Sequence, residues 1–375
     1  MTNPQQPAAP VPQPVLSPPA GTAIFLVVRV NPGGERAVRA LLPDLAGLQR
    51  SVSARVPAGA LTCVAGIGSA AWDRLFGGPR PAGLHPFPEL AGAKYIAIAT
   101  PGDLLFHIKA RSMNLCFEMT AQIMDRLSGA VTVEDEVHGF RYFEERDLLG
   151  FVGGAGNPGG PAAEAVLVGG EDPRFAGGSY VIAQKYLHEM RAWNALPAEE
   201  QERVLGRRKL SNIPLPGGTQ PGNSHVALTA TAGPGGARRP ILRDKMPFGS
   251  AGRGEFGTYF TGYAAHPGVI EQMLSSMFIG DPPGNYDRIL DFSAAVTGGL
   301  FFAPSADFLS GPAGPPGPPA RAAAAPEPGL ATGAPPPGLS AEPPPPGIPQ
   351  PSPGGTEHIG GLTRSGPAVT IPPRA

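Results

Sequence analysis

Apolar residues in the first 150 positions alternate between short β-rich runs and longer stretches with helical spacing. Residues 23–30 (AIFLVVRV) predict a strand that ends at the turn sequence NPGG, residues 31–34. Residues 34–56 place apolar side chains three and four positions apart, which predicts a helix interrupted near Pro43. The same reading predicts short helices at 70–77 and 115–131, strands at 61–68, 95–102 and 131–143, and a strand or a strand leading into a helix at 103–112.

The second half of the chain repeats this alternation of β-rich runs and helical spacing. Strands are predicted at 179–190 and 257–265, helices at 192–210 and 267–280, and residues 295–305 close the folded body. Each half therefore has a β-α-β order with an antiparallel return, and it is not a succession of βα units. This pattern predicts an α+β fold built from two similar halves.

Glycine and proline show how far this body extends. The chain has 375 residues, of which 53 are Gly and 49 are Pro. Residues 1–20 hold 7 of the prolines and residues 311–355 hold 17. We therefore expect a Pro-rich leader (1–20), an N-terminal half (21–150), a C-terminal half (151–310), a flexible linker (311–355) and a tail (356–375).

Charge and cysteine content exclude several classes of protein. The net charge is −1, with 29 basic and 30 acidic residues, which argues against nucleic acid or an anionic membrane as the main partner. Cys63 and Cys116 could form one disulfide, although a reduced pair is expected in the cytoplasm, and no Cys/His cluster indicates zinc. The first residues have neither the basic nor the apolar region of a secretory signal, and no apolar stretch reaches membrane-spanning length, so a cytoplasmic protein is expected.

Common nucleotide and hydrolase motifs do not account for the chain. It has no GxGxxG after a strand, no P-loop and no HExxH. The Gly-rich segment 150–160 could bind a phosphate through backbone N–H groups, but it lacks the Lys-Ser/Thr partner of a P-loop.

Eight strings over residues 15–310 resemble one family when they are taken in order. They resemble the dye-decolorising peroxidases, specifically the bacterial B-type branch: DLLFHIKAR, RYFEERDLLGFVGGAGNP, GRRKL, NSHVAL, ILRDKMPFG, GTYFTGY, MLSSMFIGDPPGNYDRILDF and AVTGGLFFAPS. The resemblance implies two ferredoxin-like halves with antiparallel sheets and haem b bound between them. It also implies that members form closed oligomers, hexamers among B-type ones.

The resemblance assigns the proximal side of the haem to the string NSHV. His225 would bind the iron, and Asp287 would accept a hydrogen bond from its other ring nitrogen, with Asp291 as the second candidate. Without the motif, a lone His is more often a core or surface residue, and either Asp could simply end a turn or cap a helix. His107 belongs to another family string and is interpreted as structural or as lying near the haem edge, with no firm role.

On the distal side the resemblance assigns an arginine. Arg243 would polarise bound hydroperoxide and stabilise the charge that develops as the O–O bond breaks. The competing interpretation is a surface ion pair with Asp244. Arg207, in the family's GR string, would pair with a haem propionate, whereas Arg208 and Lys209 are expected to be solvated.

The sequence departs from the family where a catalytic aspartate is expected. The family pattern is GFxDG followed by NP, and this chain has Gly153 in place of the aspartate. Lys245 stands where Asn is common, and Pro214 where an acidic residue is common. We expect Gly153 to leave room for a water that acts with Arg243, and Gly153→Asp to speed the reaction with peroxide, since a positioned acid/base group contributes about 10²–10⁴-fold.

Beyond the linker, residues 356–364 (TEHIGGLTR) resemble the short C-terminal peptides that load cargo into encapsulin shells. Ile359, Gly360 and Leu362 match the LGIGxLK-like core of those peptides. The two apolar side chains would anchor the peptide, and the glycine would let its backbone lie close to a groove. This predicts an encapsulin shell protein as partner and a nanocompartment in the cytoplasm as location.

These observations favour a haem peroxidase that reduces hydrogen peroxide, oxidises an unidentified donor and travels as encapsulin cargo. Trp193 and Tyr286 are candidates for passing electrons to bulky donors, although aromatic residues are more often part of a core. The alternative is a haem-binding or storage cargo with little turnover, because the distal aspartate is absent. A haem-free scaffold is a third possibility.

Overall fold

The computed structural model describes residues 9–154, 157–230 and 239–311. The chain divides into two units, Met1–Ala322 and Ala323–Ala375, and all described residues lie in the first. The expected linker, apart from Gly311, and the expected tail with Ile359, Gly360 and Leu362 therefore lie outside the described residues.

The first half pairs four strands in the order β6-β1-β5-β2, and every pair is antiparallel. Two helices cover one face of these strands, because α1 and α3 place their leucines and Met119 in the same buried cluster as Ile24 and Leu26 of β1. Numbered by sequence within the half, the strand order is 4-1-3-2, the arrangement of a ferredoxin-like βαββαβ unit. The elements are β1 (Thr22–Val30), α1 (Glu35–Ser53), β2 (Thr62–Gly68), α2 (Ser69–Phe76), β5 (Leu104–Ala110), α3 (Met113–Arg126) and β6 (Val131–Phe140).

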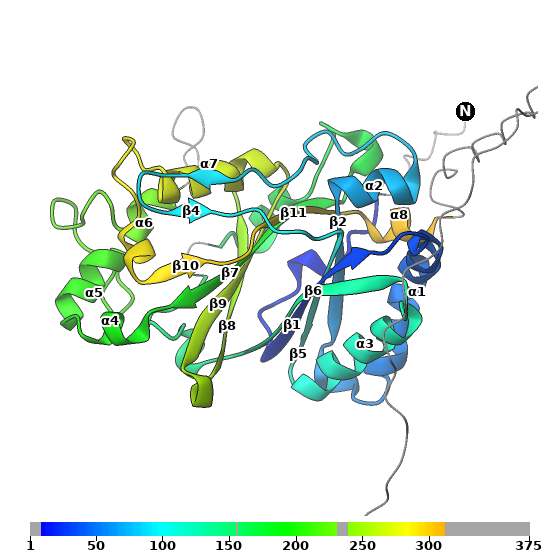
Figure 1. Ribbon diagram of the computed structural model, residues 1–375, viewed down its shortest axis with the longest axis horizontal. Coiled ribbons are helices and arrows are strands. Elements are labelled where there is room, and N and C mark those ends of the chain that lie inside the picture. The colour runs from blue at the N-terminus through cyan, green and yellow to red at the C-terminus, as the bar shows by residue number, and fades with distance from the viewer. Residues whose placement is uncertain (1–8, 155–156, 231–238, 312–375) are drawn as a thin grey trace, which may run out of the picture. The chain divides into compact units, whose positions relative to one another are not determined.

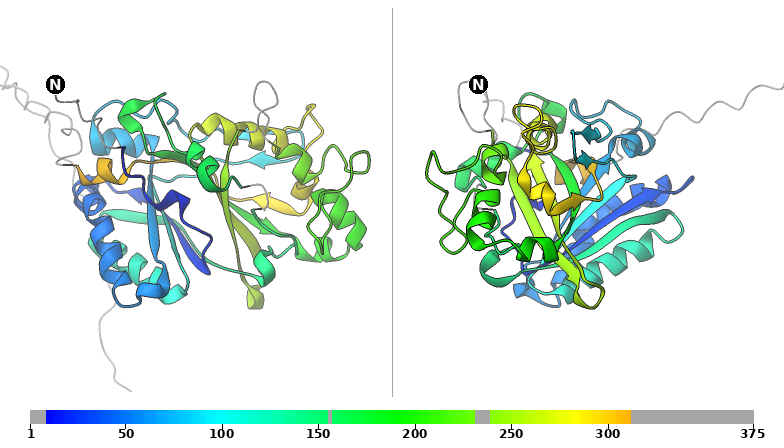
Figure 2. Two further views of the ribbon diagram at one scale, coloured as in Figure 1. Left: turned by 180° about the vertical axis from the view of Figure 1, so that it is seen from behind. Right: turned by 60° about the vertical axis from the view of Figure 1, so that its left-hand side comes forward.

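The second half repeats the strand order as β11-β7-β9-β8, again antiparallel throughout. A short strand, β10, pairs with β7 outside this order. Figures 1 and 2 show the two halves beside each other, with α1 and α3 at one end of the body and α4 to α7 at the other. The elements are β7 (Ser179–His188), α4 (Met190–Asn194), α5 (Ala198–Leu205), α6 (His225–Leu228), β8 (Leu242–Ser250), β9 (Glu255–Ala264), α7 (Pro267–Phe278), β10 (Ser293–Ala295), β11 (Gly299–Ala303) and α8 (Ala306–Ser310).

One junction joins the halves into a single sheet. β11 pairs with β2 through Phe301 opposite Gly68 and Phe302 opposite Ile67. The outermost strands also approach each other, since a Cβ added to Gly139 of β6 would lie 2.8 Å from Cγ of Met246 in β8. The predicted α+β fold of two ferredoxin-like halves is thus confirmed.

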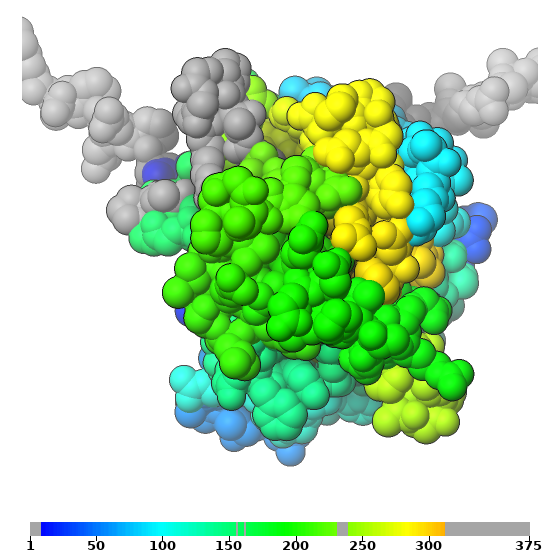
Figure 3. Space-filling model, turned by 90° about the vertical axis from the view of Figure 1, so that its left-hand side faces the viewer, coloured from blue at the N-terminus to red at the C-terminus, as the bar shows by residue number. Residues whose placement is uncertain are grey.

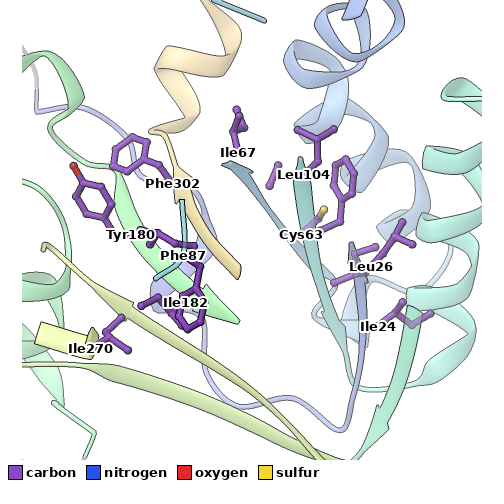
Figure 4. Packing of buried hydrophobic residues seen from close by; sticks show 14 of the residues in the cluster. Ile24, Leu26, Cys63, Ile67, Phe87, Leu104, Tyr180, Ile182, Ile270 and Phe302 are labelled. Atoms are coloured by element: carbon purple, nitrogen blue, oxygen red, sulfur yellow. The ribbon is translucent and has the colours of Figure 1, made fainter. Parts of the chain in front are cut away.

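The sheet buries side chains on both faces. One face packs against the helices, and Figure 4 shows part of this core, including Leu26, Ile67 and Ile182. The other face forms a second cluster, in which the ring of Phe25 in β1 stacks on Tyr259 in β9 with centroids 4.2 Å apart. Alternate residues of one strand therefore serve two separate cores, as the period of two in a strand requires.

Several local predictions were wrong. α1 continues through Pro43, because the helix buries Val38, Leu41, Leu45 and other residues along one face, and this burial outweighs one lost backbone hydrogen bond. The region 192–210 does not form one helix, since Pro197 separates α4 from α5. Residues 95–102 contribute only the two-residue strand β4 (Ile96–Ala97), which pairs with β3 (Leu90–Ala91).

The cysteines are free and buried. Burial raises the pKa of the Cys63 thiol to about 12, so this group is a protonated, apolar part of the core.

Candidate active site

A cavity of about 550 Å³ is lined by residues of the second half, whose surface faces the viewer in Figure 3. Its described lining residues all fall between Asp147 and Ser293, on β7 to β10, α6, α7 and the segment that leads into the second half. The volume suits a small organic ligand or cofactor, and most of the lining is apolar. The described lining thus belongs to the second half and to the segment that leads into it.

His225 and Asp287 meet at the wall of this cavity. His225 is the first residue of α6, after Ser224, and its Nδ1 lies 2.7 Å from Oδ2 of Asp287. Asp287 is fully buried, and its other oxygen accepts the backbone N–H of Ile289 at 3.0 Å. The backbone N–H of Asp287 also donates to the carbonyl of Met277 at the end of α7, so the residue is held by its backbone as well as by its carboxylate. A bond at Nδ1 leaves Nε2 as the nitrogen that can bind a metal.

Asp291 lies elsewhere. It accepts hydrogen bonds from Lys94 Nζ and Tyr95 Oη, each at 2.7 Å, and Tyr286 is its third partner at 3.2 Å. Of the two carboxylates expected beside His225, the structure therefore brings only Asp287 to it.

Arg243 lines the cavity from β8 and is fixed at both its backbone groups. The side-chain amide of Asn157 donates to the carbonyl of Arg243 at 2.7 Å and accepts its N–H at 2.9 Å. The guanidinium donates to the carbonyl of Thr229 at 3.1 Å. Asn157 lies within a family string, but its role depends on the fold, because it bonds to a residue 86 positions away.

The surface pair of Arg243 with Asp244 does not form. Adjacent residues of a strand point to opposite faces of the sheet. Asp244 points to the inner face, the one that carries the second buried cluster, where its Oδ2 lies 2.6 Å from Lys109 Nζ. His107 lies on that same face, donating to or accepting from the Tyr263 hydroxyl at 2.8 Å. His107 is therefore a buried structural residue and does not line the cavity.

Gly153 lies directly against Lys245. A Cβ at Gly153 would be 2.8 Å from Cε of Lys245 and 3.6 Å from its Cγ. Nζ of Lys245 lies 2.9 Å from Oδ2 of Asp147, whose other oxygen accepts the N–H of Phe151 at 3.1 Å. The Lys245 chain thus lies beside Gly153, and a side chain at position 153 would require the flexible end of this lysine to shift.

Asp147 is a charged group in a buried place. Burial alone would raise its pKa, but the nearby Lys245 ammonium and the Phe151 N–H outweigh burial and lower it. The carboxylate is therefore ionised at neutral pH. Neither Asp147 nor its pairing with Lys245 was predicted, since these residues are 98 positions apart.

Arg207 lines the cavity as well. Its Nη1 donates to the carbonyl of Asn212 at 3.1 Å. Gly206 precedes it with φ of +86°, and a Cβ there would lie 2.8 Å from Oγ of Ser224, so this turn needs glycine to bring Arg207 beside α6. Pro214 forms an isolated bridge with Arg207.

The two basic residues after Arg207 differ from each other. Arg208 is exposed and pairs with Glu202 at 2.8 Å, as expected of a solvated residue. The expectation was wrong for Lys209, which is half-buried, bonds to Gln201 at 2.5 Å and lies over the ring of Phe151.

His188 is a lining residue that the sequence did not reveal. Its two ring nitrogens bond to Ser293 Oγ at 2.7 Å and to Thr258 Oγ1 at 2.8 Å. Burial lowers its pKa to about 4, so the ring is neutral at neutral pH.

The two aromatic relay candidates have different surroundings. Trp193 is buried, and its indole N–H donates to the carbonyl of Leu149 at 3.0 Å, so it presents no surface to a bulky donor. Tyr286 is half-buried beside Tyr95, with ring centroids 5.3 Å apart.

The donor set decides which cofactor the cavity fits. Within the described residues, no cluster of three or more His, Cys, Asp or Glu side chains could hold a metal ion. The same residues contain no helix long and apolar enough to cross a membrane. One imidazole backed by a carboxylate, an apolar wall and the cationic side chains of Arg207, Arg239 and Arg243 fit a haem, which needs one protein ligand and partners for two propionates.

Comparison with known families agrees with this donor set. The family model described as Dyp-type peroxidase, N-terminal, matches residues 12–141, and the C-terminal model matches residues 144–308. The chain therefore belongs to the Dyp-type peroxidase family, and it is a haem peroxidase.

Relatives of high identity support this assignment. The dye-decolorizing peroxidase of Rhodococcus erythropolis is 62% identical over 303 residues, which are 80% of this chain and 89% of that protein. The dye-decolorizing peroxidase of Mycobacterium tuberculosis is 55% identical over 302 residues, 80% of this chain and 90% of that protein.

Solved structures agree as well. The encapsulated DyP-type peroxidase of Mycobacterium smegmatis superposes with a TM-score of 0.81 at 56% identity, covering 83% of this chain and 100% of that one. DypB of Rhodococcus jostii gives 0.79 at 53% identity, covering 81% and 99%. A variant of that protein was solved in complex with heme, with a TM-score of 0.79 at 53% identity, covering 80% and 98%.

Proposed function

We propose that this haem peroxidase is a B-type member of its family, that it uses haem b, and that it reduces hydrogen peroxide while oxidising an unidentified donor by one-electron steps. The observation that carries the proposal is the 2.7 Å contact of His225 with a fully buried carboxylate at the wall of the cavity. Haem bound there would supply the redox-active iron at which peroxide is reduced.

The chain's own residues would hold and tune that iron. His225 would bind it through Nε2, because Nδ1 is occupied by Asp287. A carboxylate that accepts the Nδ1 proton fixes the orientation of the ring and makes it a stronger donor. Arg207 would pair with a propionate, as a guanidinium does with carboxylates.

Arg243 would act on the peroxide. Its guanidinium stays charged, and Asn157 fixes its backbone, so the charge is in place before the substrate arrives. We propose that Gly153 occupies the place of the family's aspartate, so that no carboxylate at this position carries a proton between the peroxide oxygens. The alternative, a haem-binding or storage cargo with little turnover, rests on this loss.

Rapid mixing with peroxide tests the proposal. Haem-loaded protein should change its Soret absorption within seconds of mixing, and no change in that time would favour the storage alternative. The informative variant is the double substitution Gly153→Asp/Lys245→Asn, because in Gly153→Asp alone the end of the Lys245 chain would have to shift and its ammonium could pair with the new carboxylate.

The double variant should react about 10²–10⁴-fold faster if the missing carboxylate limits the rate. The matched control is Lys245→Asn alone, which opens the same space without supplying a carboxylate. Equal rates in the double variant and this control would contradict the role assigned to position 153.

We also propose that the protein is packaged in an encapsulin shell in the cytoplasm. Residues 356–375 carry the targeting peptide with Ile359, Gly360 and Leu362, and the Pro-rich residues 311–355 supply its reach. The encapsulated relative from Mycobacterium smegmatis supports this idea. Deleting residues 356–375 should abolish co-purification with the shell protein while the Soret band stays unchanged, and unchanged loading would overturn the packaging.

The remaining parts of the proposal concern the organisation of the chain. We propose a leader at 1–20, an N-terminal half at 21–150 and a haem-binding half at 151–310. We further propose a homo-oligomer, a hexamer by its resemblance to B-type members. Light scattering of the haem-loaded protein gives the mass directly, and a monomer at micromolar concentration would contradict the oligomer.

A further inference from the structure

Met273 places a thioether against the arginine of the cavity. It lies on α7 and lines the cavity, and its Sδ is 3.5 Å from Nη2 of Arg243. The residue is only 3% exposed, so little of it meets bulk solvent, whereas a molecule inside the cavity lies against it. Met273 is therefore an oxidisable group that is reached through the cavity.

The sulfur is a weak partner for a guanidinium. A thioether accepts hydrogen bonds poorly, and the same Nη2 of Arg243 also donates to the carbonyl of Thr229, a stronger acceptor, at 3.1 Å. Adding one oxygen to the sulfur would put a polar sulfoxide oxygen in place of the weak acceptor. The contact would then become a charge-assisted hydrogen bond, so a single oxygen atom would change how firmly the Arg243 side chain is held.

The guanidinium of Arg243 also favours the reaction that adds this oxygen. In that reaction the sulfur attacks one oxygen of hydrogen peroxide, the O–O bond breaks, and the proton of the attacked oxygen passes to the leaving oxygen, which departs as water. The sulfur loses two electrons and the peroxide gains them. Negative charge develops on the leaving oxygen, and a guanidinium beside it stabilises that charge. Hydrogen peroxide is thus the one oxidant that the reaction needs.

We infer that Met273 is a site of oxidative modification, at which hydrogen peroxide converts the thioether to a sulfoxide that then binds the Arg243 guanidinium. The inference rests on the proposed function in one respect, that peroxide enters this cavity to meet Arg243. The sulfoxide would hold the guanidinium toward α7, so excess peroxide would slow the enzyme. Methionine sulfoxide reductases reverse this modification, so they would also restore the rate.

Met277 is a matched control on the same helix. It lies one turn further along α7, it is 5% exposed, and it lines the same cavity. Its carbonyl accepts the backbone N–H of Asp287 at 2.8 Å. Met273 and Met277 thus share their helix and their burial, and they differ in the charged residue that each contacts.

Peptide mass spectrometry tests the site after graded exposure of the haem-loaded full-length chain to hydrogen peroxide. Met273 should gain one oxygen about 10- to 100-fold faster than Met277, the range expected when one hydrogen bond from a charged group stabilises the transition state. Fragment ions assign the oxygen, because three residues lie between the two methionines. Equal oxidation of both would overturn the inference.

Two leucine variants test what the modification does to the rate. After exposure, the wild type should react with fresh peroxide about 10-fold more slowly than before, because the guanidinium is engaged by the sulfoxide. Met273→Leu should keep its own starting rate, whereas the matched control Met277→Leu should lose rate as the wild type does. Methionine sulfoxide reductase should restore the exposed wild type. A Met273→Leu protein that loses rate as fast as the wild type would overturn the role of this methionine.

Failure of this inference and failure of the proposed function give different results. A prompt Soret change on mixing with peroxide, without preferential oxidation of Met273, would overturn the modification site and leave the peroxidase standing. Preferential oxidation of Met273 in a haem-loaded protein whose Soret band does not respond to peroxide would contradict the proposed function and support the modification site.

Discussion

Asp287 illustrates what one buried carboxylate can decide. It is fully buried, it caps the turn at residues 288–291 through the N–H of Ile289, and it meets His225 at 2.7 Å. One carboxylate thus fixes a local turn through Oδ1 and orients a ring that is 62 positions away through Oδ2. A residue with both duties tolerates few replacements.

Asp287→Asn should retain the fold, because the amide oxygen can still accept the Ile289 N–H, but it removes the charge behind His225. We expect iron coordination to weaken about 10- to 100-fold, as is common for such supporting residues, and the reduction potential of the iron to rise. Spectroelectrochemistry measures the potential. Asp291→Asn is the control, since Asp291 contacts Lys94 and Tyr95 instead, and an equal shift in both variants would contradict the pairing.

Sequence patterns predicted single residues unevenly. His225, Asp287, Arg207 and Arg243 could be singled out because each lies within a contiguous family string. The contacts of Asp147 with Lys245 and of Asn157 with Arg243 join residues 98 and 86 positions apart, so they depend on the path of the chain between them. The contact between Gly153 and Lys245 could not be predicted for the same reason.

At the scale of elements, the strand junction between the halves depends on small residues. β2 lies between β5 and β11, and its Gly66 has no room for a side chain. A Cβ there would lie 2.9 Å from Cβ of Phe301 and 3.3 Å from Cγ1 of Val181. The neighbours are themselves buried side chains, so they cannot move aside freely.

Gly66→Leu should therefore lower the free energy of unfolding by about 1–3 kcal/mol, the usual cost of overpacking a core. Denaturant unfolding measures it. Gly47→Ala in α1 is the control, because its Cβ would meet only a guanidinium at 3.8 Å, and it should raise stability by about 0.5–1 kcal/mol. An unchanged free energy of unfolding in Gly66→Leu would contradict the claim that the neighbours of Gly66 cannot move aside.

The type of an element, helix or strand, could be predicted where its sequence pattern was long. The prediction failed where tertiary packing outweighed a local preference of the sequence. The strand at 23–30 was predicted from its β-rich run and the turn signal after it, and the helix at 267–280 from its apolar spacing. The predicted interruption at Pro43 does not occur, because six buried residues on one face of α1 keep the helix continuous through this proline. Pro197, without such a face around it, does end a helix.

The two halves repeat one architecture, but they contribute unequally to the cavity that contains His225 and Arg243. Both halves have the same strand order, yet the described lining of the cavity comes only from residues 147–293. The first half contributes instead to the inner core, where His107 of β5 bonds to Tyr263 of β9. The repeat of the fold in the two halves is therefore not matched by a repeat of the cavity-lining residues.

Buried His107 makes global stability depend on pH. Burial lowers its pKa from the usual 6.5 to about 3, so between these values the unfolded chain binds a proton that the folded chain does not. Stability is thus full above pH 6.5 and falls as the pH drops, by up to about 1.4 kcal/mol per pH unit.

In His107→Gln, the fall in unfolding free energy between pH 6 and 4.5 should be smaller by about 1–2 kcal/mol than in the wild type. His138→Gln, which replaces an exposed histidine, is the comparison variant. Denaturant titrations at several pH values measure it, and identical slopes in all three proteins would show that His107 is protonated in the folded state.

The most direct test of the central claim concerns the bond between His225 and the iron. Absorption spectroscopy of the reconstituted protein should show one haem per chain with a Soret band in the wild type. His225→Gly should lose this band, and added imidazole should restore it, because the free base can fill the space left by the side chain beside Asp287. A His225→Gly protein that takes up haem with the wild-type spectrum and affinity, without imidazole, would contradict the account.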